Sequence, residues 1–473
     1  MHRHDDAIEV LTQAVVRYAI DRTRLDPPPL DRPRTLTELR AMAGHTIVPH
    51  GIGGLEALRV FGDVLAPACI SVDHPRFLSF VPAAPTEASI LFDLVVGASC
   101  IYGGSWMEGA GAVFAENEAL RWIADLAGLP PEAGGVFVSG GTAGNLSALI
   151  AARWVWRRDT GGVHDRTRGL LLASGGAHSS VAQAARAMDV DVVRVPPDDR
   201  GRLTRDALRT TVDELTDDER ERLFALVATG GTTNAGVIDD LRAVADVTAE
   251  LGVWMHVDGA YGGAGLAAPS VRDHFAGVEA ADSFIVDPHK WLFAPYDSCA
   301  LLYRDPEIGR QAHTQHAEYL DVLHAEHGSP DTPAQWNASD LAHHLSRRAR
   351  GLPLWFSLAT HGTDAYRDAI ETTLRVTREG AALVDAAAHL ELLMEPELSI
   401  VLFRRVGWDA ARYQAWSDAQ LAAGTAFVTP TAWGAETVLR WCIVNPLTTV
   451  DDLAAIVASL ADDPPDSAAA GDG

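Results

Sequence analysis

The run Asp287-Pro-His-Lys-Trp-Leu292 is the strongest local sign of chemistry in this sequence. It follows Ser283-Phe-Ile-Val286, an apolar segment that predicts a buried strand. A loop lysine is most often a solvated surface charge. A lysine in a desolvated site can instead be a nucleophile, because desolvation lowers the pKa of its amine. The residues expected around Lys290 decide between these two interpretations.

Asp258 follows another apolar segment, Val253-Trp-Met-His-Val257, that also predicts a buried strand. A buried carboxylate is costly unless a cation or hydrogen bonds satisfy it. A strand-end or turn aspartate would explain this motif taken alone. A protonated pyridinium nitrogen is another suitable partner, and a carboxylate that keeps it protonated lets the ring accept electrons.

Three further motifs follow predicted strands. Val138-Ser-Gly-Gly-Thr-Ala-Gly-Asn145 leads into a helical run, 146–157, and a helix N-terminus presents free N–H groups to a phosphate. Ala228-Thr-Gly-Gly-Thr-Thr-Asn234 suits a phosphate or a ring equally. Ala177-His-Ser-Ser180 opens a helix, where His178 either faces a ligand or simply caps the helix. Each pattern is common by itself.

Short apolar segments alternate with helical patterns over residues 77–302, which predicts an α/β fold with a mostly parallel sheet and helices on both faces. The seven expected strands are Val136–Ser139, Leu170–Ala173, Asp191–Val195, Phe224–Ala228, Val253–Val257, Ser283–Val286 and Ala300–Tyr303. Ligands of such sheets bind at the carboxyl ends of the strands. We therefore expect the five motifs to meet at one edge of the sheet.

Four regions are expected along the chain. They are an N-terminal helical arm with a proline-rich break at 1–75, a large α/β domain at 76–350, a small α+β domain at 351–461 and a disordered polar tail at 462–473. The small domain should begin with helices over Leu352–Gly362 and Asp364–His389. Gln311–Ser339 lacks periodicity, which predicts a long functional loop.

The composition disfavours several classes of protein. Thirty-eight basic and 64 acidic residues give a net charge of −26, which repels nucleic acid and anionic membranes. The most apolar stretch is too short to span a membrane, and the acidic start lacks the basic patch of a signal peptide. Four scattered cysteines without a C-x-x-C pair argue against a zinc site and for reduced core thiols. We expect a cytoplasmic protein with no metal, nucleic-acid or membrane partner.

Together and in this order, the motifs resemble those of the group II pyridoxal phosphate-dependent decarboxylases, the family of aromatic L-amino acid, histidine and glutamate decarboxylases. The steps of 25, 32 and 29 residues from Thr233 to Asp258, then to Lys290 and then to Tyr319, match the family's spacing. The resemblance covers about 74–446. It implies a fold-type I enzyme, like aspartate aminotransferase, with pyridoxal 5'-phosphate as cofactor. It also implies an obligate homodimer with the active site at the interface and the N-terminal arm on the partner.

The resemblance also assigns roles to individual residues. Lys290 would carry the cofactor as a Schiff base, Asp258 would pair with the pyridinium nitrogen, and His178 would stack on the ring. The other implied cofactor contacts are Gly141, Thr142, Thr233, Ala260, Asp287 and His289. Tyr319 matches a mobile-loop tyrosine that protonates the carbanionic carbon after CO2 leaves, which favours simple decarboxylation to an amine.

Two features depart from the aromatic-specific members of that family. Asp287 stands where they tend to carry an asparagine that bonds the phosphate. A carboxylate there would repel phosphate, or would bind a protonated histidine such as His289. The expected substrate contacts lie in segments that look less aromatic and less hydroxylated, and they are Phe80, Pro82, Tyr102 and Trp106. Core packing explains these aromatic side chains equally well.

The expected reaction is decarboxylation of an L-amino acid, with an aromatic substrate favoured and small aliphatic or acidic substrates left open. A related fold-type I enzyme would instead transaminate, act as another lyase, or couple decarboxylation to oxidative deamination that gives an aldehyde. A cofactor-binding regulatory protein without catalysis is disfavoured, because all four catalytic candidates are present.

Overall fold

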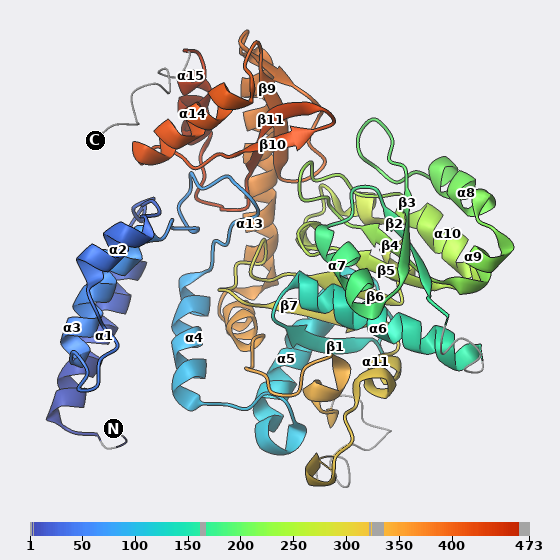
Figure 1. Ribbon diagram of the computed structural model, residues 1–473, viewed down its shortest axis with the longest axis horizontal. Helices are drawn as coiled ribbons and strands as arrows, with labels where there is room; N and C mark the ends of the chain where they lie inside the picture. Colours follow the sequence, from blue (N-terminus) through green and yellow to red (C-terminus); the bar gives the residue numbers. More distant parts are fainter. Residues whose placement is uncertain (1, 3, 161–166, 321–322, 324–334, 463–473) are drawn as a thin grey trace.

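A computed structural model describes residues 2, 4–160, 167–320, 323 and 335–462 of the chain. A large α/β part surrounds a seven-stranded sheet, and a smaller part contains a four-stranded sheet. A group of N-terminal helices lies to one side of both parts (Figure 1).

The seven strands of the large sheet have the order β1-β7-β6-β5-β4-β2-β3. Their bounds are β1 (Gly134–Val138), β2 (Leu170–Ser174), β3 (Asp191–Val195), β4 (Leu223–Thr229), β5 (Trp254–Asp258), β6 (Ser283–Val286) and β7 (Cys299–Tyr303). All neighbours pair in parallel except β7, which is antiparallel to β1 and β6. The predicted mostly parallel seven-stranded sheet is confirmed, and each strand lies within two residues of its expected ends.

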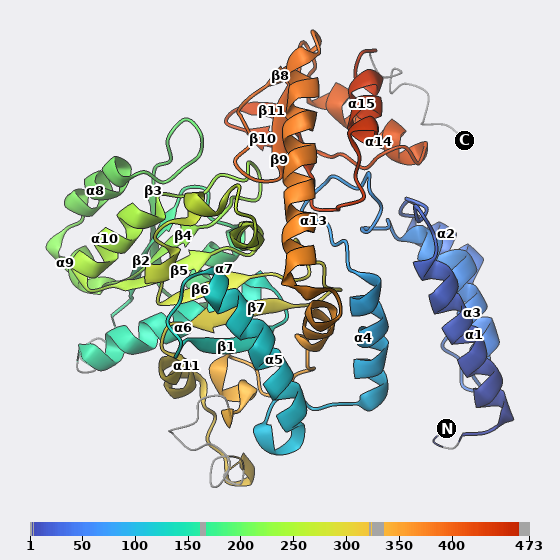
Figure 2. The ribbon, with the colours of Figure 1, turned by 180° about the vertical axis from the view of Figure 1, so that it is seen from behind.

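Helices cover both faces of this sheet (Figures 1 and 2). The helices of the large part are α5 (Trp106–Leu126), α6 (Gly141–Asp159), α7 (Ser179–Met188), α8 (Arg205–Glu214), α9 (Asp217–Arg222), α10 (Leu241–Leu251) and α11 (Pro306–His313), with 3-10 turns η3 (Gly262–Ala267), η4 (Arg272–Phe275) and η5 (Val278–Ala280). Alternate strand residues enter two separate buried clusters, Leu172 and Phe284 in one, Leu171 and Ile285 in the other. The strands are continuous apolar runs because both of their faces are buried.

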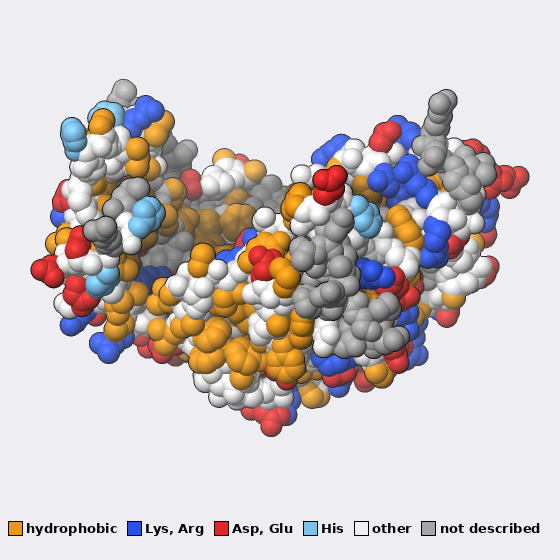
Figure 3. Space-filling view, turned by 90° about the horizontal axis from the view of Figure 1, so that it is seen from below, with side chains coloured by type: hydrophobic (Ala, Val, Ile, Leu, Met, Phe, Trp, Pro, Cys, Tyr) orange, Lys and Arg blue, Asp and Glu red, His pale blue; other side chains and the backbone are white. Residues whose placement is uncertain are grey.

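The N-terminal helices pack loosely against the body. They are α1 (Asp6–Thr23), α2 (Leu36–Ala43), α3 (Gly54–Val60), the π-helix η1 (Phe61–Leu65) and η2 (Ala66–Ala68). The next helix, α4 (Glu87–Ser99), packs against the body and buries Ser89 and Val96. No residue of α1 or α2 is buried. A groove of about 1110 Å³ lies between α1 and α4, and Figure 3 shows this hollow with hydrophobic side chains on its floor. None of the helices in the described ranges is long and apolar enough to cross a membrane.

The two helices expected over 352–389 form one element, α13 (Leu352–Ala386), with a kink at Gly362. Gly362 has φ 76° and ψ 161°, which glycine adopts readily and which interrupts the helix. The helix ends three residues before the expected His389. It runs from the large sheet to the small one (Figure 2).

The small sheet is antiparallel with the order β10-β11-β9-β8. Its strands and the helices beside it are β8 (Leu390–Leu392), β9 (Ile400–Arg405), α14 (Ala410–Ala422), β10 (Pro430–Trp433), β11 (Glu436–Cys442) and α15 (Val450–Ser459).

The expected loop Gln311–Ser339 is not a loop throughout. Its first three residues complete α11, and 3-10 turns form at η6 (Glu318–Leu320) and η8 (Ala338–Leu341). The hydrophobic pattern of the sequence does not predict the end of α11, because a histidine, His313, occupies one of the buried positions of this helix. Residues 321–322 and 324–334 of this segment, and 463–473 of the expected tail, lie outside the described residues.

The cysteines differ in exposure, although all four are free thiols. Cys299 and Cys442 are buried, as expected of core thiols. Cys69 and Cys100 are exposed, so the expectation is wrong for these two, which lie in the loosely packed N-terminal region.

Candidate active site

A cavity of about 320 Å³ opens at the carboxyl ends of β1, β4, β5 and β6. Its wall includes all nine of the expected cofactor contacts, which are Gly141, Thr142, His178, Thr233, Asp258, Ala260, Asp287, His289 and Lys290. Motifs far apart in the sequence meet here because parallel strands end at the same edge of the sheet.

Lys290 is the single lysine of the chain, and every other one of its 38 Lys and Arg residues is an arginine. The chain's one side-chain amine therefore lies in this cavity. A guanidinium stays protonated in proteins, whereas a lysine can lose its proton and attack a carbonyl group. The position of Lys290 therefore indicates that the cavity can support a reaction between an amine and a carbonyl group.

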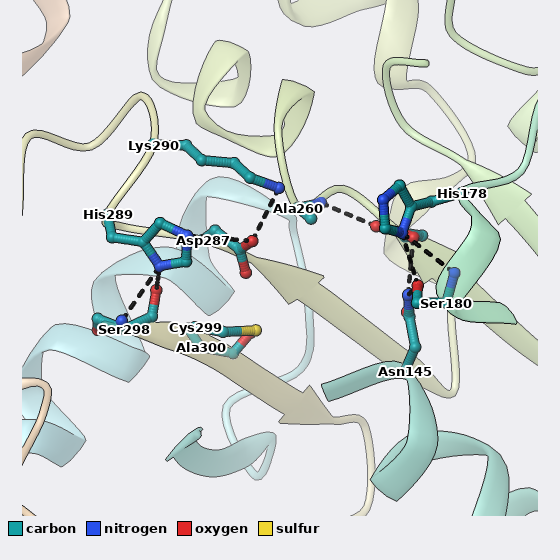
Figure 4. A network of polar contacts seen from close by, with 11 residues as sticks. Asn145, His178, Ser180, Ala260, Asp287, His289, Lys290, Ser298, Cys299 and Ala300 are labelled. Atoms are coloured by element: carbon teal, nitrogen blue, oxygen red, sulfur yellow. Dashed lines mark hydrogen bonds and ion pairs between the residues drawn. The ribbon is translucent and has the colours of Figure 1, made fainter. Parts of the chain in front are cut away.

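Lys290 forms an ion pair with Asp287 (Figure 4). Its Nζ lies 2.9 Å from Asp287 Oδ2, and His289 Nε2 lies 3.7 Å from the same oxygen. Burial disfavours the ammonium, but the Asp287 carboxylate raises the pKa of Lys290 above its usual value. Burial also opposes ionisation of Asp287, but Lys290 and His289 hold its pKa below the usual value. Burial lowers the pKa of His289, so Lys290 takes the place of the protonated histidine expected beside Asp287.

The N-terminus of α6 borders the cavity and suits an anion. No side chain caps this 19-residue helix at Gly140. The N–H groups of Ala143 and Gly144 bond to the Gly140 carbonyl, which leaves those of Gly141 and Thr142 as first-turn amides without a partner inside the helix. A Cβ added to Gly141 would lie 3.2 Å from atoms of Ala260 and Asp287. A glycine therefore fits here without displacing Ala260 or Asp287, and the positive helix end stays open to an anion.

Asp258 ends β5 and is 4% exposed. Its Oδ2 accepts a hydrogen bond of 2.8 Å from Asn145 Nδ2, and its Oδ1 accepts one of 3.1 Å from the Ala260 N–H. Both partners are neutral, and no ion pair joins Asp258 to a basic side chain among the described residues. A carboxylate oxygen can accept a further bond, so a cationic N–H donor in the cavity would complete its environment.

His178 is both the N-cap of α7 and part of the cavity wall. Its Nδ1 accepts a hydrogen bond from the Ser180 N–H at 3.2 Å and lies 2.8 Å from Ser180 Oγ (Figure 4). The two interpretations of this histidine, a helix cap and a ligand-facing ring, are therefore compatible.

The expected substrate residues and Tyr319 do not line the cavity of this chain. Phe80 is 62% exposed and Tyr319 is 71% exposed. The hydroxyl of Tyr102 donates to a backbone carbonyl, Pro82 is buried, and Trp106 begins α5. These side chains lie on segments that do not end at the carboxyl edge of the sheet.

The cavity also includes residues without an expected role, among them Asn145, Ser180, Tyr296 and Asp297. Asn145 is the last residue of the glycine-rich motif and is 1% exposed, one turn into α6. Tyr296 and Asp297 come from the turn between β6 and β7, which has no pattern of its own. Asp297 is paired with Arg350 at 2.9 Å.

Comparisons with known proteins agree with this geometry. The family model described as "Pyridoxal-dependent decarboxylase conserved domain" matches residues 56–406. The aromatic-L-amino-acid decarboxylase of Bacillus atrophaeus is 29% identical over 82% of this chain and 81% of its own length. The L-2,4-diaminobutyrate decarboxylase of Rhizobium meliloti (strain 1021) is 31% identical over 85% of this chain and 80% of its own. The crystal structure of Oryza sativa TDC with PLP and tryptamine has a TM-score of 0.88 at 23% identity, over 97% of this chain and 98% of that chain, which shows a shared fold.

Proposed function

Since this chain belongs to the pyridoxal-dependent decarboxylase family and is a pyridoxal 5'-phosphate-dependent amino acid decarboxylase, we propose that it converts an aromatic L-amino acid to the corresponding amine and CO2. The observation that carries this proposal is the meeting of Lys290, Asp258 and the N-terminus of α6 in one cavity. An amine, a carboxylate and an anion-binding helix end suit the aldehyde, the ring nitrogen and the phosphate of that cofactor.

When bound, the cofactor supplies an aldehyde for an amine and a ring that accepts electrons from the bond to the departing carboxylate. Lys290 would hold it covalently, and the first turn of α6, with Gly141, Thr142 and His289, would bind its phosphate. Asp258 would hold a proton on the ring nitrogen, and His178 would pack against the ring. Thr233 and Ala260 would complete its contacts.

Asp287 and Tyr319 would each influence one proton of the reaction. Asp287 Oδ2 lies beside Lys290 Nζ, so it influences whether that amine carries a proton. Tyr319 would donate its hydroxyl proton to the substrate carbon after CO2 leaves. Because its side chain is 71% exposed, the segment that carries it would have to move to the cavity, where closure also excludes water.

The cavity wall supports an aromatic substrate over an acidic one. Tyr296, 51% exposed, offers a ring face beside His289 at a centroid distance of 4.8 Å. Within the described part of the chain, no arginine lines the cavity, and its lysine is already paired with Asp287. A second substrate carboxylate would therefore lack a cationic partner from this subunit. Relatives named aromatic-L-amino-acid decarboxylase support the same choice.

We also propose that this chain forms a homodimer and that it works in the cytoplasm. Large hydrophobic side chains are exposed along the N-terminal quarter of the chain, and the most exposed are Val10, Leu36, Ile47, Leu55, Phe80, Leu94 and Phe114. Val10 lies on α1 and Leu94 on α4, the two helices that border the groove. A second copy of the chain would remove this apolar surface from water and bring its own residues to the cavity mouth.

A release assay for CO2 tests the function directly. The twenty amino acids and L-2,4-diaminobutyrate are supplied to the protein loaded with pyridoxal phosphate, and Lys290→Arg serves as the inactive control. Release from tryptophan, tyrosine or phenylalanine supports the proposal. Release from L-2,4-diaminobutyrate alone would show that this amino acid, and not an aromatic one, is the substrate. Release from none would refute decarboxylation of these compounds.

A further inference from the structure

We propose that Asn145 is a positioning residue for two cavity side chains, Asp258 and His178. In turn, His256, which lies behind the cavity wall, fixes the amide of Asn145. The inference rests on the proposed function, because it concerns how the two ring-facing groups of that site are held.

The amide of Asn145 has one consistent orientation. Its Nδ2 lies 2.8 Å from Asp258 Oδ2 and 2.9 Å from Ser180 Oγ, and its Oδ1 lies 2.8 Å from His256 Nε2. A carboxylate only accepts hydrogen bonds, so the amide nitrogen must face Asp258. Exchanging the two amide atoms would bring two acceptor oxygens together at a buried position, where the repulsion is poorly screened.

The orientation of the amide determines the proton position on His256. The amide oxygen of Asn145 only accepts, so His256 Nε2 carries the hydrogen. Burial lowers the pKa of His256 to about 4, although Asp258 raises it, so the ring is neutral and its Nδ1 accepts. The Ser283 hydroxyl, 2.8 Å away, donates to Nδ1 and accepts from the indole N–H of Trp254 at 2.8 Å. Each donor in this buried chain therefore points toward Asp258.

A branch from the same amide reaches His178. The second N–H of Asn145 donates to Ser180 Oγ, so the Ser180 hydroxyl hydrogen is free to donate to His178 Nδ1. The backbone N–H of Ser180 donates to the same nitrogen. With Nδ1 accepting from both, Nδ1 carries no hydrogen, so the ring hydrogen of His178 is on Nε2. One amide thus sets the direction of Asp258 and the position of the ring hydrogen of His178. Figure 4 shows the side chains of Asn145, Ser180 and His178 that form this branch.

The arrangement engages both N–H groups and the oxygen of the Asn145 amide. Removing the donor at His256 would leave a buried amide oxygen unpaired and let the side chain rotate. Such a rotation would break the bonds to Asp258 and Ser180 together. The two ring-facing groups would then have to be ordered when the cofactor binds, which weakens binding.

The test measures the affinity for pyridoxal phosphate by titrating it into the cofactor-free protein and following its absorbance. His256→Leu should weaken the affinity by roughly tenfold or more. His256→Gln places an amide N–H near the position of Nε2 and should restore most of the loss. The control is His313→Leu, because His313 is also buried with a pKa lowered by burial to about 4, bonds to a backbone carbonyl and does not line the cavity. It should leave the affinity unchanged.

Unchanged affinity in His256→Leu, or an equal loss in His313→Leu, would overturn the inference. A wild-type protein that binds no pyridoxal phosphate would refute the proposed function instead, so the two failures are distinct. If His256→Leu does not fold, the ring nitrogen shifts of His256 in the wild-type protein decide. A hydrogen on Nε2 of a neutral ring is expected at neutral pH, and a charged ring or a hydrogen on Nδ1 would overturn the inference.

Discussion

Lys290 Nζ and Asp287 Oδ2 lie 2.9 Å apart, so the one lysine of the chain is held as an ammonium by a buried carboxylate. An amine must lose its proton before it can attack an aldehyde. Asp287 therefore opposes capture of the cofactor at neutral pH while it positions the amine in the cavity.

Replacing Asp287 with asparagine should let the cofactor bind covalently at lower pH. Asp287 raises the pKa of Lys290 against the effect of burial, so without its charge burial lowers that pKa and the neutral fraction rises at any given pH. The pH dependence of the association rate, followed by stopped-flow absorbance, should shift its midpoint downward. Asp297→Asn is the control, because Asp297 lines the same cavity but pairs with Arg350. An equal midpoint in wild type and Asp287→Asn would contradict the role of this pair.

Asp258→Asn should reduce the rate of CO2 release by about 100-fold or more, because the variant keeps the volume but loses the charge that holds the ring proton. Protein concentration and folding are checked by circular dichroism. Asp239→Asn provides the matched control, since Asp239 is also buried and accepts backbone N–H groups, but does not line the cavity. It should lower the melting temperature and leave turnover per folded molecule unchanged. Near-normal turnover in Asp258→Asn would exclude this residue as the ring partner.

Tyr319→Phe should still bind cofactor and substrate but lose most amine production. Without the phenolic proton the carbanionic carbon persists, and dissolved oxygen can attack it to give aldehyde, ammonia and peroxide. Amine, aldehyde and oxygen consumption are measured together, with Tyr413→Phe, whose hydroxyl bonds to the backbone of Arg405, as the control. An unchanged amine yield would remove Tyr319 from the mechanism, because phenylalanine conserves nearly all of its volume. Stoichiometric oxygen use by the wild type would favour the oxidative alternative.

Phe114→Arg should convert a dimer to monomers. Phe114 lies on α5, is 56% exposed and belongs to the apolar surface assigned to a second copy, where a buried unpaired charge is costly. Sedimentation velocity gives the mass in solution. Val406→Arg, at a 52% exposed position directly after β9, is the control and should stay dimeric. A wild-type monomer would refute the dimer.

The large sheet and the meeting of Asp258 and Lys290 in one cavity could be predicted from the sequence for a physical reason. Strands buried on both faces are continuous apolar runs, and in a parallel sheet whatever follows such a run lies at the same edge. Two local patterns therefore predict that Asp258 and Lys290 lie close together, and this prediction needs no knowledge of side-chain packing. The sequence does not predict that α13 continues past Gly362, because a glycine indicates a break in a helix but not whether the helix resumes after it.

The substrate residues depend on contacts that no local pattern determines. Phe80 lies in an irregular segment and Trp106 begins α5, and neither lines the cavity of this chain. The role of Asn145 was missed for a different reason. An asparagine one turn into a helix has no distinctive spacing, and its bonds to Asp258 and His256 join residues more than 100 positions apart.

Borohydride reduction followed by peptide mapping tests the central claim most directly. The loaded protein has two kinds of amine, the side chain of Lys290 and the N-terminal α-amino group, because the chain contains one lysine. We predict one reduced pyridoxal phosphate per chain, located on the peptide that contains Lys290, and no label in Lys290→Arg, which keeps the positive charge beside Asp287. Label on the N-terminal peptide alone, or equal labelling of wild type and Lys290→Arg, would contradict the account.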